Sequence, residues 1–207
     1  MTHPAEAELV LTSERGDPRG MADAKVLARC GAFLPLFWLA LYDVDDLMLL
    51  KAWGEGSDPR VDPPELEFKV LQTSINAGLR KAEFRLPLLK KIFGKGIAAP
   101  FNMWRHFLQG QSRRIITANP HELYWLYENP QILRHQIRAG LEAFAGHGGA
   151  QVEDLLVLAG FKEGALPERI RCEKLSGQEA EIPFPPGLAG HTITTGKSSW
   201  LAALFGG

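Results

Sequence analysis

The clearest hydrophobic pattern in the chain lies between residues 75 and 93. Apolar side chains recur there at intervals of four, three, four, three and four residues: Ile75, Leu79, Ala82, Leu86, Leu89 and Phe93. This spacing places them on one face of an α-helix, and the charged side chains between them fall mostly on the other faces. Pro87 lies inside the pattern, so we expect a kink there or two helices, the second with Pro87 in its first turn.

Shorter helical patterns occur on both sides of this segment, at residues 22–29, 100–108 and 152–159. Residues 113–117 predict a short strand. Two Asn-Pro pairs, Asn119-Pro120 and Asn129-Pro130, each combine a helix N-cap with a proline suited to the first turn. We expect a helix to start at each pair, the second running to about Ala145.

The longest apolar stretch, Ala32–Tyr42 (AFLPLFWLALY), is interrupted by Pro35. It is too short to cross a bilayer, so it predicts a buried strand or a core helix and no membrane association. Leu47–Trp53 continues the apolar character. The Gly- and Pro-rich segment Gly54–Pro64 predicts a loop, which is the clearest internal break in the chain.

Alternation of apolar and polar residues replaces the helical pattern near the C-terminus. Ile170 and Cys172 alternate with charged residues, Ser176-Gly177 is typical of a turn, and the alternation resumes at Ala180, Ile182 and Phe184. This pattern indicates a β-hairpin.

The predicted fold is therefore α+β, a helix-dominated single domain with a small C-terminal β-hairpin region. We expect a flexible N-terminal tail at residues 1–20, because they carry no strong pattern. A mainly helical core domain follows at residues 21–166. Residues 167–207 form the β-hairpin and a C-terminal segment that packs on this core.

Composition agrees with a folded protein and narrows the classes of site. The chain has 207 residues, of which 45% are hydrophobic and 23% are charged, so it can bury a core without disulfides or a structural metal. Its two cysteines, Cys30 and Cys172, are far apart, and its histidines form no pair at a metal-ligand spacing. No signal peptide is evident. We expect a cytoplasmic protein with reduced thiols, no cofactor and no metal.

Charge is distributed unevenly along the chain, although the formal net charge is only −1. Residues 1–67 have a net charge of −7, residues 68–138 have +9, and residues 139–207 have −3. Acidic flanks can pack against a basic middle within one fold, and segregated charge can also select a charged protein partner. We expect the basic part to be mostly covered and the acidic part to be partly free.

Three aspartates, Asp43, Asp45 and Asp46, follow the apolar run in the sequence LALYDVDDL. An apolar strand followed by Asp-x-Asp resembles the first motif of haloacid-dehalogenase-type phosphotransferases. The resemblance implies a magnesium-dependent phosphohydrolase with Asp43 as nucleophile, Asp45 as the acid/base, and Lys81 or Lys90 as the basic residue of a later motif. Leu47 stands where that family has threonine or valine.

The basic middle segment offers another alternative, a nucleic-acid-binding module. Basic residues interleaved with aromatic ones can bind single strands by phosphate pairing and base stacking. The phosphate contacts would be Arg105, Arg113, Arg114 and Arg134. The aromatic residues lie at helical spacing, which favours a place in the core. We therefore expect a protein partner rather than a nucleic acid.

The apolar run and the acids after it, Phe33–Leu47, are similar in style to bacterial toxin-immunity proteins. The resemblance implies a non-enzymatic binding protein, without catalytic residues, that neutralises a cognate toxin by blocking a basic cleft. The candidate partner-binding residues are the acidic side chains that follow the run: Asp43, Asp45, Asp46, Glu55 and Asp58. The pattern indicates no particular oligomeric state.

Overall fold

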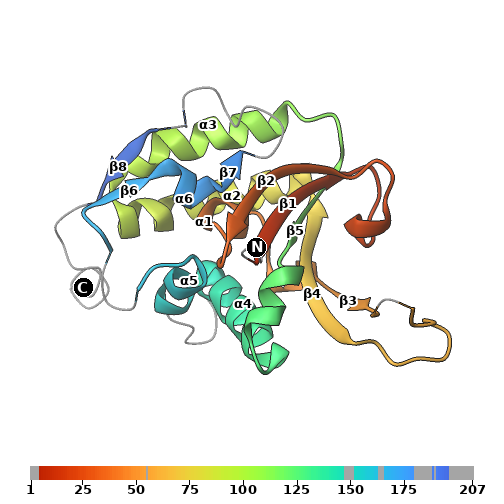
Figure 1. Cartoon of the computed structure of the whole chain (residues 1–207). Coiled ribbons are helices and arrows are strands. Elements are labelled where there is room, and N and C mark those ends of the chain that lie inside the picture. Colours follow the sequence, from red (N-terminus) through yellow and green to blue (C-terminus); the bar gives the residue numbers. More distant parts are fainter. Residues whose placement is uncertain are drawn as a thin grey trace.

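An antiparallel β-sheet runs through the computed structural model, which describes residues 5–54, 56–146, 152–162, 166–179, 188 and 190–195 (Figure 1). Its strand order is β3-β4-β5-β1-β2-β7. The strands are β1 (Glu6–Thr12), β2 (Lys25–Gly31), β3 (Leu47–Ala52), β4 (Leu66–Ser74), β5 (Ile115–Asn119) and β7 (Gln178–Glu179). A second, two-stranded antiparallel sheet joins β6 (Arg169–Arg171) to β8 (Thr192–Thr194).

Helices pack around the sheet in two groups. The α-helices are α1 (Leu36–Leu39), α2 (Ile75–Phe93), α3 (Ala98–Gln109), α4 (Pro130–Ala145), α5 (Val152–Leu158) and α6 (Cys172–Ser176). Short 3-10 helices are η1 (Pro18–Gly20), η2 (Val44–Asp46), η3 (Lys95–Ile97) and η4 (His121–Leu126). Figure 1 shows α2 beside α3, and α4 beside α5 at another part of the molecule. The predicted α+β class with a small C-terminal β element is confirmed.

Helix α2 forms where the hydrophobic spacing predicts it. The hydroxyl of Ser74, the N-cap, accepts a hydrogen bond from the amide of Ala77 at 3.3 Å, and the helix ends at Gly94. The helix is continuous through Pro87, so the alternative of two separate helices is wrong. Pro87 is exposed, and on this side water can solvate the carbonyl that loses its intrahelical donor.

The N-terminal region is part of the sheet. Strand β1 pairs with β2 on one side and with β5 on the other, and the side chains of Ala7, Leu9 and Leu11 are buried. The prediction of a flexible tail at residues 1–20 is therefore wrong for Glu6–Thr12, which is a paired strand of the sheet. The expected helix at residues 22–29 is also wrong, since Lys25–Gly31 is strand β2. A strand paired on both edges and buried reads as a short apolar run without a clear period.

The apolar run Ala32–Tyr42 contains the core helix α1. The side chains of α1 are fully buried. The ring of Phe37 packs edge-to-face on the ring of Phe101 of α3, with 4.9 Å between the ring centroids. The indole Nε1 of Trp38 donates to the carbonyl of Ser176 at 2.6 Å. This bond attaches the described part of the C-terminal segment to the core.

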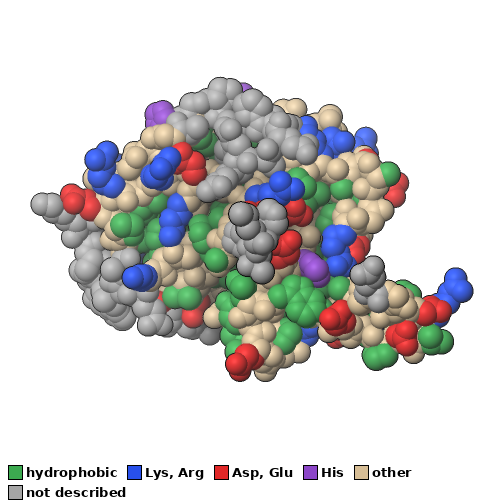
Figure 2. Space-filling model, viewed as in Figure 1, with side chains coloured by type: hydrophobic (Ala, Val, Ile, Leu, Met, Phe, Trp, Pro, Cys, Tyr) green, Lys and Arg blue, Asp and Glu red, His purple; other side chains and the backbone are tan. Residues whose placement is uncertain are grey.

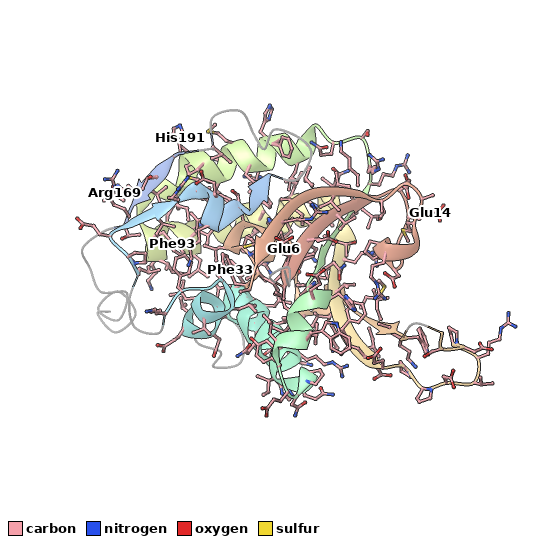
Figure 3. The ribbon with its side chains drawn as sticks, in the orientation of Figure 1. Glu6, Glu14, Phe33, Phe93, Arg169 and His191 are labelled. Atoms are coloured by element: carbon pink, nitrogen blue, oxygen red, sulfur yellow. The ribbon has the colours of Figure 1, made fainter. Side chains whose placement is uncertain are left out.

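Other predicted elements appear with shifted boundaries. Helices α3, α4 and α5 lie at the predicted segments, whereas Asn119-Pro120 precedes the 3-10 helix η4 and the strand expected at 113–117 is β5. Ile170 pairs with Ile193 of β8, but Cys172 begins helix α6 instead of continuing a strand. Ala180, Ile182 and Phe184 lie outside the described residues. Figure 3 shows Arg169 and His191 at the end of the molecule far from Glu14.

No helix among the described residues combines the length and the apolar character that a membrane span requires.

Candidate functional site

The acidic segment that follows α1 folds into the 3-10 helix η2. Asp43 is its N-cap, and the amide of Asp43 donates to Oδ2 of Asp46 at 2.7 Å. A carboxylate three residues after the N-cap can satisfy the N-cap amide in this way, which explains locally why the sequence Asp-Val-Asp-Asp turns here. The turn holds Asp43 and Asp46 in fixed positions.

Two cations of α2 face these aspartates. Lys81 Nζ lies 3.0 Å from Oδ2 of Asp43 and also binds Asp46, while Arg85 binds Oδ1 of Asp43. The side chain of Asp46 is only 9% exposed, and that of Asp43 is 38% exposed. The charges of both aspartates are therefore compensated within the fold. Their ion pairs with Lys81 and Arg85 connect the acidic segment 1–67 to the basic segment 68–138.

Arg85 is the centre of this network. Its side chain is 5% exposed, and Nη1 donates to the carbonyls of Leu39, Ala40 and Tyr42 at 3.2, 2.9 and 2.6 Å. These carbonyls lie at and just beyond the C-terminus of α1, where a positive charge is favourable. Burial lowers the pKa of the Arg85 guanidinium, and the carboxylates of Asp43 and Asp46 act in the opposite direction.

An open groove of about 420 Å³ lies between η2 and α4. Asp43, Val44 and Asp45 line it from η2 and its N-cap, and Arg138, Glu142 and Ala145 line it from α4. Arg138 Nε donates to Glu142 at 2.8 Å in a partly exposed pair.

Asp45 differs from the other aspartates of this segment. It is exposed, and the described part of the chain provides it with no ion pair or side-chain hydrogen bond. Because Asp43, Asp46 and Glu142 each have a cationic neighbour, Asp45 contributes the uncompensated negative charge of the groove. The groove is therefore suited to a positively charged side chain of a partner.

The remaining candidate residues lie elsewhere. Asp58 is exposed in the loop of the β3–β4 hairpin, which projects from the body of the molecule (Figure 1), and its Oδ1 accepts from the amide of Arg60 at 2.9 Å. Glu55 lies outside the described residues. The structure thus brings together Asp43, Asp45 and Asp46, and Asp58 does not line their groove.

The features implied by the phosphotransferase resemblance are present only in part. Lys81 does contact Asp43, but the apolar run ends in a short helix rather than a strand, and every described strand pairing is antiparallel. Both carboxylate oxygens of Asp43 bind cations. Within the described ranges, no three His, Cys, Asp or Glu side chains come together in a way that could hold a metal ion.

The four arginines considered for nucleic-acid binding do not act together. Arg105 binds Glu83 at 3.2 Å, Arg113 donates to the carbonyl of Asp23 at 2.8 Å, and Arg134 donates to the carbonyl of Glu67. Arg114 is exposed. On the face in Figure 2, basic and acidic side chains are interspersed. On this face, side chains of opposite charge therefore lie close together.

Comparisons of the chain with protein-family models, with curated proteins and with solved structures find no match. The function must therefore be argued from the geometry. Sequence reasoning missed Arg85, Arg138 and Glu142. The positions of Lys81 and Arg85, four residues apart on one predicted helix, were the available signal for a two-cation contact.

Proposed function

We propose that the chain is a non-enzymatic, cytoplasmic protein-binding module that takes a cationic side chain of its partner into the groove between η2 and α4. The observation that carries the proposal is the exposed carboxylate of Asp45 on a groove wall whose other carboxylates are compensated. An arginine or lysine entering the groove would give Asp45 the partner that the described residues do not supply.

The rigid support of the groove favours binding. Asp43 and Asp46 are fixed by Lys81 and Arg85, so the wall that carries Asp45 is already ordered before a partner arrives. Preorganisation of this kind reduces the entropy lost on association. Opposite Asp45, the pair Arg138–Glu142 is partly exposed, and such a pair contributes little to stability. Glu142 can therefore exchange its partner for an incoming cation.

The partner that we propose is a bacterial toxin domain with a basic cleft. Blocking such a cleft needs an acidic surface held in a fixed shape, and it needs no catalytic group on the blocking protein. Asp58, on the projecting β3–β4 hairpin, is a second exposed carboxylate, and it does not line the groove. This role agrees with the resemblance of residues 33–47 to toxin-immunity proteins.

Replacing Asp45 with alanine tests the proposal. We expect Asp45→Ala to raise the Kd for the cognate toxin at least tenfold, because a partner cation would be left buried without its counter-charge. Asp45→Lys should raise it further. The candidate toxin is the product of a neighbouring gene, in a catalytically inactive form, and the Kd is measured by calorimetry. Growth of cells that express the active toxin reports neutralisation.

The matched control is Glu14→Ala, which removes an exposed carboxylate far from the groove (Figure 3). Its Kd should stay within about twofold of the wild-type value, as expected for a charge remote from the interface. Equal losses for Asp45→Ala and Glu14→Ala would contradict a site at the groove. Absence of binding to every neighbouring gene product, with no protection of growth, would contradict the immunity role itself.

A magnesium-dependent phosphohydrolase is the second candidate, and the contact between Lys81 and Asp43 is the observation that favours it. We expect hydrolysis of a generic phosphate ester with magnesium to be equal for the wild-type protein and Asp43→Asn, because both oxygens of Asp43 serve the ion-pair network. A magnesium-dependent rate that disappears in a folded Asp43→Asn variant would support the enzyme instead.

A further inference from the structure

The outer face of α2 carries an unusual combination of side chains. Phe84 is 84% exposed in the middle of a 19-residue helix, where a large aromatic side chain normally packs against the core. Arg80, Lys90 and Lys91 are also exposed. At 3.6 residues per turn, these four positions and Pro87 share about one third of the helix circumference. The exposed Glu83 lies in the same sector, so the face carries three cations, one carboxylate and an aromatic side chain.

A pocket of about 350 Å³ lies beside this face, between α2 and α3. Its lining residues are Asn76, Leu79, Arg80, Glu83, Arg105 and Gln109. They supply two guanidinium groups and two amides, against one carboxylate. Polar groups of this kind bind phosphate oxygens and the edges of bases.

Hydrogen bonds fix the position of the Arg105 side chain in this pocket. Its Nη2 donates to Glu83 at 3.2 Å and its Nη1 to Asn102 at 3.3 Å. Its Nε is buried and has no hydrogen-bond partner among the described residues, which is costly for a guanidinium donor. Arg80 lines the pocket too, and the described residues give its side chain no ion pair. An anion placed in the pocket would give Arg80 the ion pair that the described residues do not supply, next to the guanidinium of Arg105.

We propose that the outer face of α2, with the α2–α3 pocket, binds single-stranded nucleic acid. One phosphate lies in the pocket against Arg80 and Arg105, a base stacks on Phe84, and further phosphates pair with Lys90 and Lys91. Arg80 and Lys91 are eleven residues apart, so the helix rise separates them by about 16 Å. This distance leaves room for Phe84 between the two basic groups, in the combination of charge and stacking that binds single strands.

The positive charge of this face disfavours the packing of two copies of the chain against each other through α2. If α2 helices of two copies packed antiparallel around Phe84, Arg80 of each would lie opposite Leu88 and within one turn of Lys91 of the other, and like charges would repel. An acidic protein surface is the competing partner. The exposed ring of Phe84 among the basic groups favours nucleic acid, because a base can stack on it. Of the four arginines considered above, the site uses only Arg105, since Arg113 and Arg134 bind backbone carbonyls within the fold.

Fluorescence anisotropy with a labelled 15-nucleotide oligo-dT and oligo-rU at increasing salt tests the proposal. We expect binding that weakens with salt, with a log–log slope near −2 to −3 for three or four phosphate contacts. The double variant Arg80→Glu/Lys91→Glu should lose affinity at least tenfold. Phe84→Ala should lose about five- to hundredfold, the value of one stacked base, with an unchanged salt slope.

The control variant makes the same charge change elsewhere. Arg15→Glu/Arg60→Glu reverses two exposed arginines, one after β1 and one in the β3–β4 hairpin, and should change affinity less than about threefold. Equal losses in the two double variants would overturn the site. Polyglutamate binding as tightly as the oligonucleotides would assign the face to an acidic protein, and equal binding of free dTMP would reduce the site to a phosphate pocket. Absence of binding at low salt would overturn the proposal outright.

Discussion

Replacing Arg85 with methionine is expected to lower the free energy of unfolding by about 3–5 kcal/mol, the usual cost of removing one partner from a buried ion pair. The guanidinium is 5% exposed, and it is the donor for three backbone carbonyls at the end of α1. Methionine preserves much of the apolar stem, so the loss measures the polar contacts rather than a cavity. Urea denaturation followed by circular dichroism gives the value.

A variant on the same helix serves as control. Arg80→Met removes an arginine from the exposed face of α2 and should change stability by less than about 0.5 kcal/mol. The double variant Arg85→Met/Asp43→Asn should cost less than the sum of its single variants, because the two side chains share one ion pair. A loss below about 1 kcal/mol for Arg85→Met would show that the network does not hold η2 on α2.

The hydrophobic periodicity was sufficient to predict α2. It also explains why the burial of Arg85 was not predicted. The residue lies off the regular stripe formed by Leu79, Ala82, Leu86 and Leu89, so on a helical projection it reads as a solvated cation. Its burial depends on α1 ending next to it, with carbonyls that accept its hydrogen bonds, and on the position of Asp43 just after this helix. Neither condition is visible in the helix itself, since both are set by tertiary packing.

The sheet was hard to predict for a related reason. Strand β1 pairs with β5, whose residues lie more than one hundred positions later, and no local pattern encodes such a partner. The acidic groove was predicted in part, because Asp43, Asp45 and Asp46 are neighbours in sequence. Its opposite wall, with Arg138 and Glu142, depends on how α4 packs against η2. The net charge of a sequence segment does not show which carboxylates have a cationic neighbour. It therefore could not distinguish Asp45 from Asp43 and Asp46.

Substitution of Gly177 by alanine is expected to destabilise the protein by about 2–5 kcal/mol, for two reasons that add. Gly177 has φ +82° and ψ 171°, a conformation that is essentially restricted to glycine. A Cβ there would lie 2.5 Å from Cζ2 of Trp38 and 3.2 Å from the carbonyl oxygen of Arg29. The contact with Trp38 is too short for a carbon atom, and the contact with the Arg29 carbonyl is tighter than most.

Neither neighbour can move away easily. Trp38 is fully buried, and its indole donates to the carbonyl of Ser176 next to the glycine. Arg29 pairs with Gln178 in the β2–β7 ladder, so a shift of its carbonyl would disturb the strand that joins the C-terminal segment to the sheet. Relief of the clash therefore requires the loss of a hydrogen bond or of strand pairing, and each outcome weakens the attachment of this segment to the core.

Substitutions at two other glycines distinguish the cost of backbone strain from the cost of the steric clash. Gly56 has φ +83° and open space around its Cβ position, so Gly56→Ala should cost only about 1–2 kcal/mol, the strain alone. Gly20 has neither a positive φ nor a close neighbour, and Gly20→Ala should be neutral. The fluorescence of Trp38, isolated by comparison with Trp38→Phe, should shift in Gly177→Ala and in neither control. If Gly177→Ala were no worse than Gly56→Ala, Trp38 would not pack on this turn, and the C-terminal segment would be held by other contacts.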